Sequence, residues 1–215
     1  MAFNRDIIKL VGFDLDQTLY KETAVTRRVY RDALYKLLAE SLKISYSEAK
    51  KRFLKSYEVL GSGTEAVRVM GIKNPEKFSA EVSTRAQQHL YLKRDERLVR
   101  LIQYLKSRYT LFLITASGEE ASCLKLEKMG LSPEYDFKYR IFGDSPHGGK
   151  TIGRSFRRMV ELSRRKPQEH LYVGDREATD IIPAQKVGMQ TAMAWHKSRI
   201  ADIELPTIYD LKKII

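Results

Sequence analysis

The sequence of 215 residues contains a single cysteine, Cys123, which excludes an internal disulfide. Cys123 lies within a helical pattern over residues 119–129, where we expect a small buried residue rather than a catalytic thiol. No apolar stretch approaches the roughly 20 residues that a membrane span needs, and the amino terminus lacks the apolar segment of a signal peptide. We therefore expect a cytoplasmic protein with no membrane partner.

Histidine is also scarce, and none of its positions has the spacing of metal ligands, so we interpret the histidines as surface or packing residues. They are His89, His147, His170 and His196. The sequence has no internal repeat and no low-complexity tract. Its 43% apolar content is enough to bury a core.

Acidic residues are fewer than basic ones, with 27 Asp and Glu against 39 Lys and Arg and a net charge of +12. This balance favours phosphate-bearing partners through long-range attraction. The basic residues are scattered, however, and no run combines them with the aromatic residues of a surface that binds single-stranded nucleic acid. We interpret them mainly as a basic solvated surface, expect no nucleic-acid partner, and expect a monomer or homodimer.

Apolar runs of strand length alternate with helical patterns through most of the chain. This alternation predicts an α/β fold, a Rossmann-like parallel sheet with helices on both faces. The predicted strands cover residues 7–13, 109–115, 139–142, 170–173 and 190–195. The predicted helices of this part cover residues 96–107, 119–129 and 177–187, with another that follows Lys150 and ends near Arg165.

Residues 21–95 contain helical patterns and no strand pattern. We expect helices that begin at Thr23 or Thr26 and after Ser45 or Ser47, then a break over residues 61–64. A short helix over 65–70 and a longer one over 75–92 follow. We therefore predict two domains, a Rossmann-like catalytic core of residues 1–20 and 96–215 and an inserted all-helical domain of residues 21–95.

Two carboxylates, Asp14 and Asp16, follow the first predicted strand directly. Residues two apart on an extended chain point to the same side, so both can project past the carboxyl end of the strand, where open α/β sheets bind ligands. Carboxylates held close together need a cation or a shared proton. The alternative is that they only turn the chain and cap the next helix.

Other predicted strands also end on polar residues. Thr115 and Ser117 follow the second strand, Lys150 precedes a helix, and Asp175 and Asp180 follow a later strand. Each residue taken alone has a simpler interpretation as a helix cap, a solvated lysine or a turn. Because the carboxyl ends of parallel strands meet at one edge of the sheet, their order and placement favour a common site.

These segments resemble the four ordered motifs of the haloacid dehalogenase superfamily, phosphatase branch. The motifs are Phe13 to Leu19, Thr115 after an apolar strand, Lys150, and Val173 to Asp180. The helical insertion stands where that superfamily has its type-one cap. The sequence departs from the pattern at Ala116, where Asn or Gly is common, and after Lys150, where the usual proline is absent.

The resemblance implies a magnesium-dependent phosphatase in which Asp14 attacks phosphorus to form an aspartyl-phosphate. Asp16 would act as general acid and then as general base, which requires a carboxyl with a raised pKa. Lys150 would offset negative charge, and Thr115 with its neighbours would bind phosphoryl oxygens. The implied substrate-binding residues are Thr115, Ala116, Ser117 and Lys150. The implied Mg²⁺ site consists of Asp14, the backbone carbonyl of Asp16 and Asp175 as ligands, with Asp180 acting through a water or orienting a neighbour.

The expected substrate is a small phosphorylated metabolite, such as a nucleotide or a sugar phosphate. Tyr57, the loop of residues 61–64 and Arg68 are candidate substrate contacts from the cap. Three alternatives stay open at this point: a phosphomutase, a phosphatase of nucleic-acid ends, and a non-catalytic phosphate-binding regulatory protein of the same fold.

Overall fold

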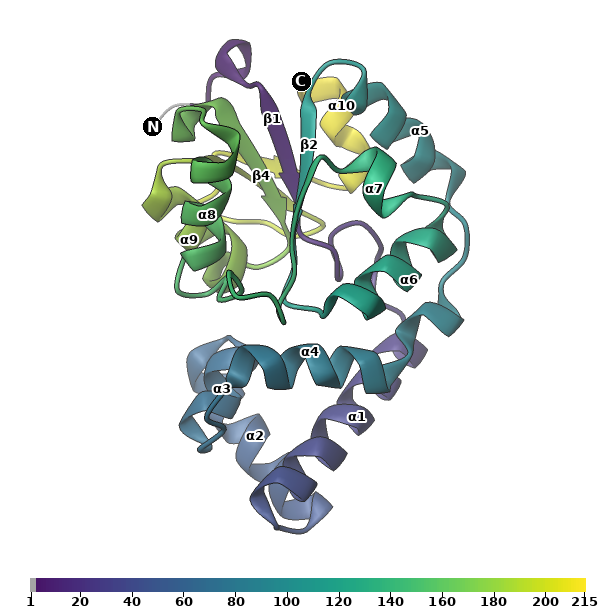
Figure 1. Cartoon of the computed structure of the whole chain (residues 1–215), viewed down its shortest axis with the longest axis vertical. Helices are drawn as coiled ribbons and strands as arrows, with labels where there is room; N and C mark the ends of the chain where they lie inside the picture. The colour runs from purple at the N-terminus through teal and green to yellow at the C-terminus, as the bar shows by residue number, and fades with distance from the viewer. Residues whose placement is uncertain (1–2) are drawn as a thin grey trace.

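The computed structural model describes residues 3–215 and contains a six-stranded parallel sheet (Figure 1). The strand order is β3-β2-β1-β4-β5-β6, and every neighbouring pair is parallel. The strands are β1 (Leu10–Phe13), β2 (Thr110–Ile114), β3 (Tyr139–Ile141), β4 (His170–Gly174), β5 (Gln190–Ala194) and β6 (Ile203–Leu205). The predicted α/β class and parallel sheet are confirmed.

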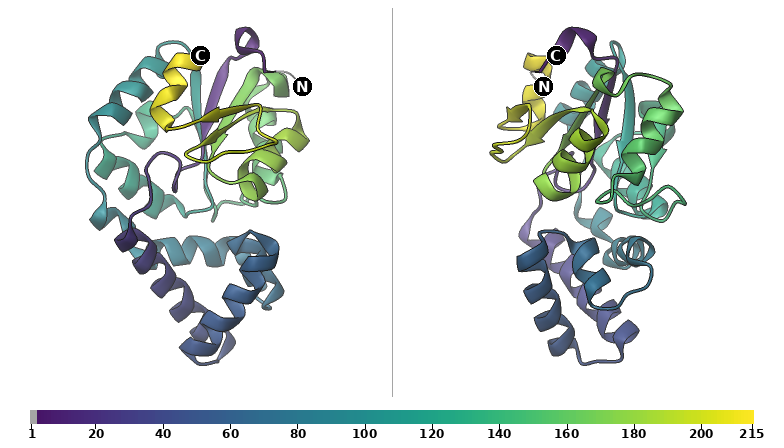
Figure 2. Two further views of the ribbon diagram at one scale, coloured as in Figure 1. Left: turned by 180° about the vertical axis from the view of Figure 1, so that it is seen from behind. Right: turned by 90° about the vertical axis from the view of Figure 1, so that its left-hand side faces the viewer.

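Helices cover both faces of the sheet, as the two views of Figure 2 show. Because side chains alternate along a strand, β2 sends Leu111 and Leu113 into one hydrophobic cluster, and Phe112 and Ile114 into another. The first cluster contains residues of α5 (Glu96–Lys106), α6 (Glu119–Met129) and α10 (Leu211–Ile214). The second contains residues of α8 (Arg154–Ser163) and α9 (Ile182–Val187).

Four helices lie together below the sheet in Figure 1, and we call them the cap helices. They are α1 (Ala24–Leu42), α2 (Tyr46–Leu60), α3 (Gly63–Val69) and α4 (Pro75–Ala86). Their apolar faces form a hydrophobic cluster of their own, which includes Leu38, Phe53 and Phe78. This separate cluster is what an inserted domain requires, although the exact division at residues 21 and 95 stays a prediction.

The cap helices begin where hydroxyl or amide side chains accept hydrogen bonds from their free backbone N–H groups. Thr23 accepts from the N–H of Thr26 at 3.1 Å, and Ser45 accepts from the N–H of Glu48 at 3.2 Å. Ser62 caps α3 in the same way. The expected starts at Thr23 and Ser45 are confirmed, whereas the predicted loop over 61–64 is shorter because Gly63 and Thr64 already belong to α3.

Several element boundaries differ from the prediction. Residues Arg5–Ile7 form a 3-10 turn capped by Asn4, so the first strand starts only at Leu10. The predicted helix over 75–92 ends at Ala86, because Gln87 has a left-handed backbone, and a 3-10 turn follows over Gln88–Tyr91. The three-residue strand β6 was not predicted, since it is too short for a clear alternation.

The remaining short elements connect the strands and helices. The segment after α6 includes the four-residue helix α7 (Pro133–Asp136). Cys123 on α6 is only partly buried, against the main core cluster, rather than fully buried as expected. The other short turns are η3 (Pro167–Glu169), the π turn η4 (Glu177–Ile181) and η5 (Ile208–Asp210).

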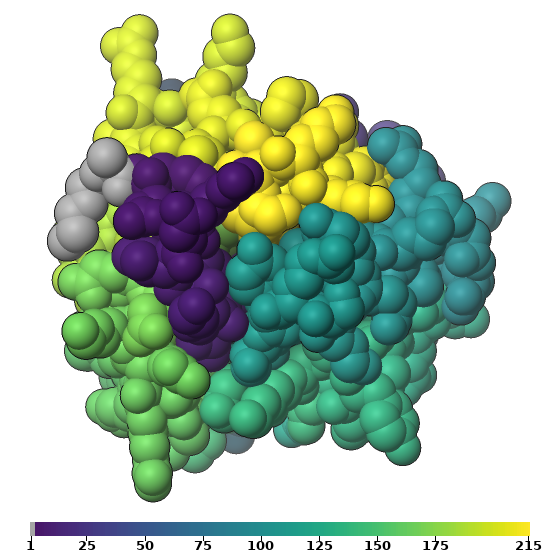
Figure 3. Space-filling model, turned by 90° about the horizontal axis from the view of Figure 1, so that it is seen from above, coloured from purple at the N-terminus to yellow at the C-terminus, as the bar shows by residue number. Residues whose placement is uncertain are grey.

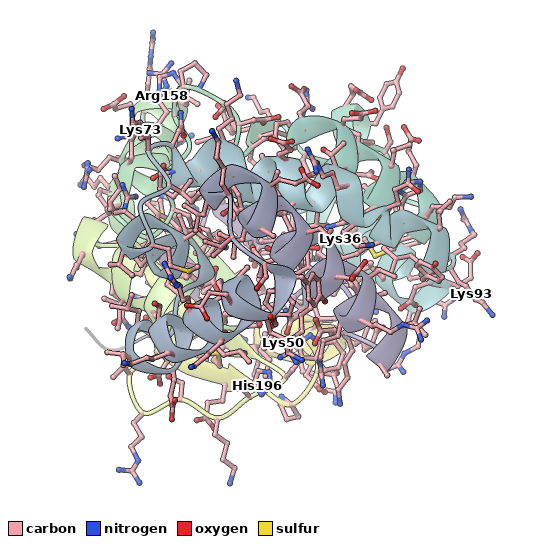
Figure 4. The ribbon with its side chains drawn as sticks, turned by 90° about the horizontal axis from the view of Figure 1, so that it is seen from below. Lys36, Lys50, Lys73, Lys93, Arg158 and His196 are labelled. Atoms are coloured by element: carbon pink, nitrogen blue, oxygen red, sulfur yellow. The ribbon has the colours of Figure 1, made fainter. Side chains whose placement is uncertain are left out.

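On the face opposite the cap helices, the first residues that the structure describes lie close to the C-terminal residues (Figure 3). In Figure 3 the yellow C-terminal residues lie beside the purple N-terminal residues. Figure 4 shows the cap side, where the labelled Lys36, Lys50, Lys73 and Lys93 are spread over the face rather than gathered in one patch. Within residues 3–215, no helix combines the length and apolar character needed to cross a membrane.

Candidate active site

Asp14 lies at the carboxyl end of β1, where its N–H extends the sheet by donating to the carbonyl of Val173 at 2.9 Å. Its side chain is buried and accepts hydrogen bonds from Lys150 and Thr18. Lys150 Nζ lies 2.5 Å from Asp14 Oδ1, and Thr18 Oγ1 lies 3.1 Å from Asp14 Oδ2. The backbone of Thr18 is held in turn by Trp195, whose Nε1 donates to the Thr18 carbonyl at 2.9 Å.

Lys150 reaches Asp14 from the segment between β3 and α8. The lysine side chain is buried and forms a second ion pair with Asp180. Burial alone would lower the pKa of Lys150, but Asp14 and Asp180 together raise it well above its usual value. Lys150 is therefore a fixed positive charge beside two carboxylates, not the solvated lysine that the sequence also allowed.

Three buried carboxylates, Asp14, Asp175 and Asp180, have oxygen atoms within 4.8 Å of one another. Burial raises the pKa of Asp14 to about 8 and is opposed by Lys150, while Asp180 and Asp175 add to the rise. Burial and Asp180 likewise raise the pKa of Asp175 to about 6. Crowded carboxylate oxygens are the donor set of a hard divalent cation, so the cluster fits Mg²⁺.

Asp180 reaches this cluster because Gly174 leaves room for it. A Cβ atom on Gly174 would lie 2.3 Å from the Cβ of Asp180. Asp180 itself sits in the π turn η4, where its Oδ2 accepts a hydrogen bond from the N–H of Arg176 at 3.1 Å. The prediction of a regular helix over 177–187 is therefore wrong for its first turn, because residues Glu177–Ile181 form a π turn. This π turn carries the carboxylate of Asp180.

Asp16 does not join the cluster through its side chain. Its carboxylate binds Lys125 of α6, with Nζ 2.5 Å from Oδ1. Ser117 Oγ donates to Asp16 Oδ2 at 2.5 Å, and the Tyr20 hydroxyl donates to Oδ1 at 2.6 Å. The two aspartates thus have separate cationic partners, although they follow the same strand.

The pKa of Asp16 differs from the expectation. Burial would raise it, but Lys125 and the hydrogen bonds from Lys125, Ser117 and Tyr20 outweigh burial and lower the pKa. The expected raised pKa is therefore wrong for the protein without ligands. The physical reason is a lysine more than one hundred residues away in sequence, which the motif did not reveal.

Lys125 is the main residue that the sequence analysis missed. Its side chain is 1% exposed. It stands on the buried face of α6 with Ser122 and Leu126, where a lysine costs free energy unless a carboxylate pairs with it. A lysine on the apolar face of a predicted amphipathic helix was the available signal.

Thr115, Ala116 and Ser117 follow β2 and lie beside Asp14 and Asp16, as expected. The Thr115 hydroxyl accepts a hydrogen bond from the N–H of Ser117 at 3.1 Å, which holds the turn. The Ser117 hydroxyl in turn donates a hydrogen bond to Asp16. The expected substrate-binding segment is thus in place, but its hydroxyls already have partners within the protein.

These residues line a cavity of about 130 Å³ between the sheet edge and the cap helices, which we call the reaction cavity. Pockets for drug-sized ligands usually measure 300 Å³ or more, so this one suits a small ligand. The core contributes Asp14, Asp16, Gln17, Tyr20, Thr115, Ala116, Ser117, Lys150, Thr151, Asp175, Arg176, Thr179 and Asp180. The segment before α1 and the cap contribute Glu22, Tyr30, Ser62, Gly63, Thr64, Ser79 and Gln88.

The expected cap contacts are only partly correct. Ser62, Gly63 and Thr64 line the reaction cavity, but Gly61 does not. Tyr57 lies outside this cavity and lines a neighbouring one. Arg68 lines neither cavity, because its guanidinium pairs with Glu65 and Glu76 on the cap surface, and its assignment as a substrate contact is wrong.

The parallel sheet thus carries a buried lysine and three buried carboxylates at its carboxyl edge. The sequence profile of the haloacid dehalogenase-like hydrolase family matches residues 11–194, and the chain belongs to that family.

Two relatives are similar over nearly the whole chain. A glyceraldehyde 3-phosphate phosphatase of Methanocaldococcus jannaschii is 27% identical over 207 residues, which cover 92% of this chain and 89% of that protein. The protein of the same name from Pyrococcus abyssi is 26% identical over 199 residues, which cover 89% of this chain and 82% of the relative. The family and these names bear out the expected enzyme class, a phosphoric monoester hydrolase.

A solved structure shares the fold. The crystal structure of a HAD phosphatase from Thermococcus onnurineus has a TM-score of 0.64 with this chain and 24% sequence identity. The similarity covers 96% of this chain and 97% of that one, so it includes both the sheet and the cap helices.

Proposed function

We propose that this enzyme is a magnesium-dependent phosphatase that hydrolyses a small phosphomonoester through an aspartyl-phosphate on Asp14. The observation that carries the proposal is the placement of Asp14, a buried carboxylate 2.5 Å from Lys150 Nζ that opens onto a cavity of about 130 Å³. A carboxylate at a strand end that is fixed by a lysine and lies in a small cavity is positioned to attack a phosphoryl group.

The metal ligands in this proposal are the side chains of Asp14, Asp175 and Asp180, with the backbone carbonyl of Asp16. The three carboxylates are already gathered within 4.8 Å, which supports a divalent cation at this place. When bound, Mg²⁺ would offset negative charge on the transferring phosphoryl group. Lys150 contributes a second positive charge beside Asp14.

The proposed reaction has two steps. An Asp14 oxygen bonds to phosphorus, the bond from phosphorus to the ester oxygen breaks, and the leaving alkoxide takes a proton from Asp16. A water then attacks phosphorus and gives a proton to Asp16, the bond to Asp14 breaks, and inorganic phosphate leaves. Asp16 is ionised beside Lys125 in the resting protein, so it must first take up a proton, and its resting state fits the second step directly.

Thr115, Ala116 and Ser117 are proposed to bind the phosphoryl oxygens. All three line the reaction cavity after β2, and backbone N–H groups at such a turn can donate to oxygens that gain charge in the transition state. The Ser117 hydroxyl already donates to Asp16 and the Ser117 N–H already donates to the Thr115 hydroxyl, so either donor would have to exchange its partner for a phosphoryl oxygen. Residues 21–95 are proposed as a cap that helps to select the substrate and exclude water.

The experiment is release of inorganic phosphate from a panel of phosphomonoesters, with MgCl₂ or with a chelator. Glyceraldehyde 3-phosphate, which the names of the relatives specify, belongs in the panel with nucleotides and hexose phosphates. We expect turnover that depends on Mg²⁺. Asp14→Asn should abolish it while the fold is kept, because an amide of nearly the same shape is a poor nucleophile.

The matched control is Asp32→Asn, which changes an exposed aspartate of α1 that pairs with Lys36. Turnover by Asp14→Asn within tenfold of the wild type would sink the aspartyl-phosphate mechanism. Asp175→Ala should lose the response to Mg²⁺, and equal wild-type activity with and without chelator would count against the metal assignment. Formation of an isomeric sugar phosphate instead of inorganic phosphate would favour a phosphomutase.

A further inference from the structure

A second cavity of about 270 Å³ adjoins the reaction cavity, and we call it the side cavity. The two cavities share the residues Gln17, Glu22, Tyr30, Gly63, Ser79 and Arg176, so a ligand in the first can extend into the second. One wall of the side cavity is apolar and comes from the cap, with Leu34, Phe53 and Val67. The cavity is therefore placed where the part of a phosphomonoester beyond the phosphate would lie.

At the junction of the two cavities the core contributes two polar residues, Arg176 and Gln17. Arg176 follows Asp175 after β4, and its Nε lies 3.4 Å from Asp175 Oδ2. Within residues 3–215, no protein oxygen accepts a hydrogen bond from the two terminal amino groups of Arg176, and the side chain is 36% exposed. Arg176 can thus offer a planar pair of donors to a ligand.

Arg27 and Arg31 also line the side cavity but, unlike Arg176, neither lines the reaction cavity, so Arg176 is the arginine at the junction of the two. Arg27 is already paired with Glu22 at 2.5 Å. Tyr57 stacks on Phe53, with 5.7 Å between ring centroids, which fixes it in the cavity wall. Burial raises the pKa of Tyr30 to about 12, so its hydroxyl keeps its proton at neutral pH and can donate as well.

We propose that the side cavity binds the leaving group of the substrate and that Arg176, at the junction of the two cavities, donates hydrogen bonds to an acceptor oxygen of that group. The ligand class is a short phosphomonoester whose carbon chain ends in a carbonyl or a carboxylate, because a guanidinium matches such oxygens and the apolar wall covers the carbons. This inference rests on the proposed phosphatase function and names a specificity residue for it.

The experiment measures kcat/KM with MgCl₂ for three substrates of similar length: glyceraldehyde 3-phosphate, 3-phosphoglycerate and propyl phosphate. The first ends in a carbonyl, the second in a carboxylate, and the third has no acceptor. We expect the wild type to favour at least one of the first two over propyl phosphate by tenfold or more. Arg176→Met should lower kcat/KM for that substrate by roughly 10- to 100-fold, as the loss of a charged hydrogen bond implies.

Propyl phosphate is the internal reference: Arg176→Met should lower its kcat/KM by a factor at least tenfold smaller than the factor lost for the preferred substrate, since any effect through Asp175 acts on all three substrates alike. Arg68→Met is the matched control variant, since Arg68 lines neither cavity, and it should leave all three substrates unchanged. Arg176→Lys keeps the charge but not the planar pair of donors, and we expect it to restore only part of the lost activity.

An equal loss for propyl phosphate and the other two substrates would overturn the inference, because Arg176 would then act only through Asp175. Magnesium-dependent hydrolysis with no preference among the three substrates would overturn it too, while the proposed phosphatase function would stand. If the wild type hydrolyses none of them nor any ester of the wider panel, the proposed function and this inference fail together. If Arg176→Met does not fold, the same comparison is made with Arg176→Lys, and an unchanged preference overturns the inference.

Discussion

At the scale of single residues, the pairing of Asp16 with Lys125 separates the two aspartates that follow β1. Lys125 pairs with Asp16, while Lys150 pairs with both Asp14 and Asp180. The two carboxylates proposed to do chemistry thus pair with different lysines, so the charge around Asp14 and the charge around Asp16 are set by different residues. The sequence shows that both aspartates follow the first strand, but it does not show which lysine pairs with which aspartate.

We predict that Lys125→Met lowers kcat at least tenfold, because Asp16 loses the cation that fixes its carboxylate. The loss of a charged hydrogen bond should also cost about 1.5–3 kcal/mol of unfolding free energy. Steady-state kinetics and urea unfolding measure the two effects. The control is Lys128→Met, which changes the other lysine on α6, and an unchanged kcat in Lys125→Met would remove Lys125 from the mechanism.

His170 is a buried histidine outside the active site, in agreement with the expected packing role. Its Nδ1 lies 3.0 Å from the carbonyl oxygen of Lys166, and its Nε2 lies 2.8 Å from Ser163 Oγ. Burial lowers the pKa of His170 below 6.5, although the carbonyls of Lys166 and Pro167 oppose this. The unfolded chain therefore binds more protons at this residue than the folded protein does.

We predict that His170 makes the protein less stable as the pH falls below about 6.5, the ordinary histidine value. The loss continues until the pH passes the lower pKa of the folded state, and each unit of difference is worth about 1.4 kcal/mol. Urea unfolding at pH 7.5 and 5.5 should show a smaller difference for His170→Gln than for the wild type. Equal differences would mean that other groups cause the acid destabilisation.

At the scale of elements, the end of β4 and the turn that follows it build the edge that we propose binds the metal. Gly174 closes the strand, and the π turn then brings Asp180 back against it. The sequence predicted the strand and a helix after it, but not the wider first turn. Periodicity reports which face of a helix is buried, and it does not report a local change in hydrogen bonding.

We predict that Gly174→Ala lowers activity by more than 100-fold, because the new Cβ atom would lie 2.3 Å from Cβ of Asp180 and force Asp180 out of the carboxylate cluster. The MgCl₂ concentration needed for half-maximal activity should rise at the same time, and a titration of activity against MgCl₂ measures it. Gly71→Ala is the control for backbone strain without a clash: no atom lies within 4 Å of the added Cβ, and the φ of +98° at Gly71 should lower stability but not activity. Wild-type activity in Gly174→Ala would show that catalysis does not require Asp180 at its position in the carboxylate cluster.

At the scale of the whole molecule, the cap helices have a hydrophobic cluster separate from the two clusters of the core. The reaction cavity lies between these parts and takes residues from both. A cap with its own core can move relative to the sheet without exposing the main core. This arrangement suits a site that must admit a substrate and then exclude water.

We predict that hydrogen exchange will separate the two parts. Amides of α1 and α2 should open with a lower free energy than amides of β1 and β4, because their cluster is smaller and closer to solvent. Phe53→Ala, which removes a ring from the cap cluster, should speed exchange in the cap and leave β1 unchanged. Equal acceleration in both parts would contradict the proposed domain division at residues 21 and 95.

The sequence by itself determined the parallel sheet and most helix boundaries, because buried strands and amphipathic helices have distinct periods. It also determined that Asp14, Lys150, Asp175 and Asp180 meet, since the carboxyl ends of parallel strands share one edge. Only the tertiary structure decided that Lys125 pairs with Asp16, that Arg68 points away from the site, and that Arg176 joins two cavities. Such contacts depend on the distances between side chains of different elements, and neither period nor spacing in the sequence contains those distances.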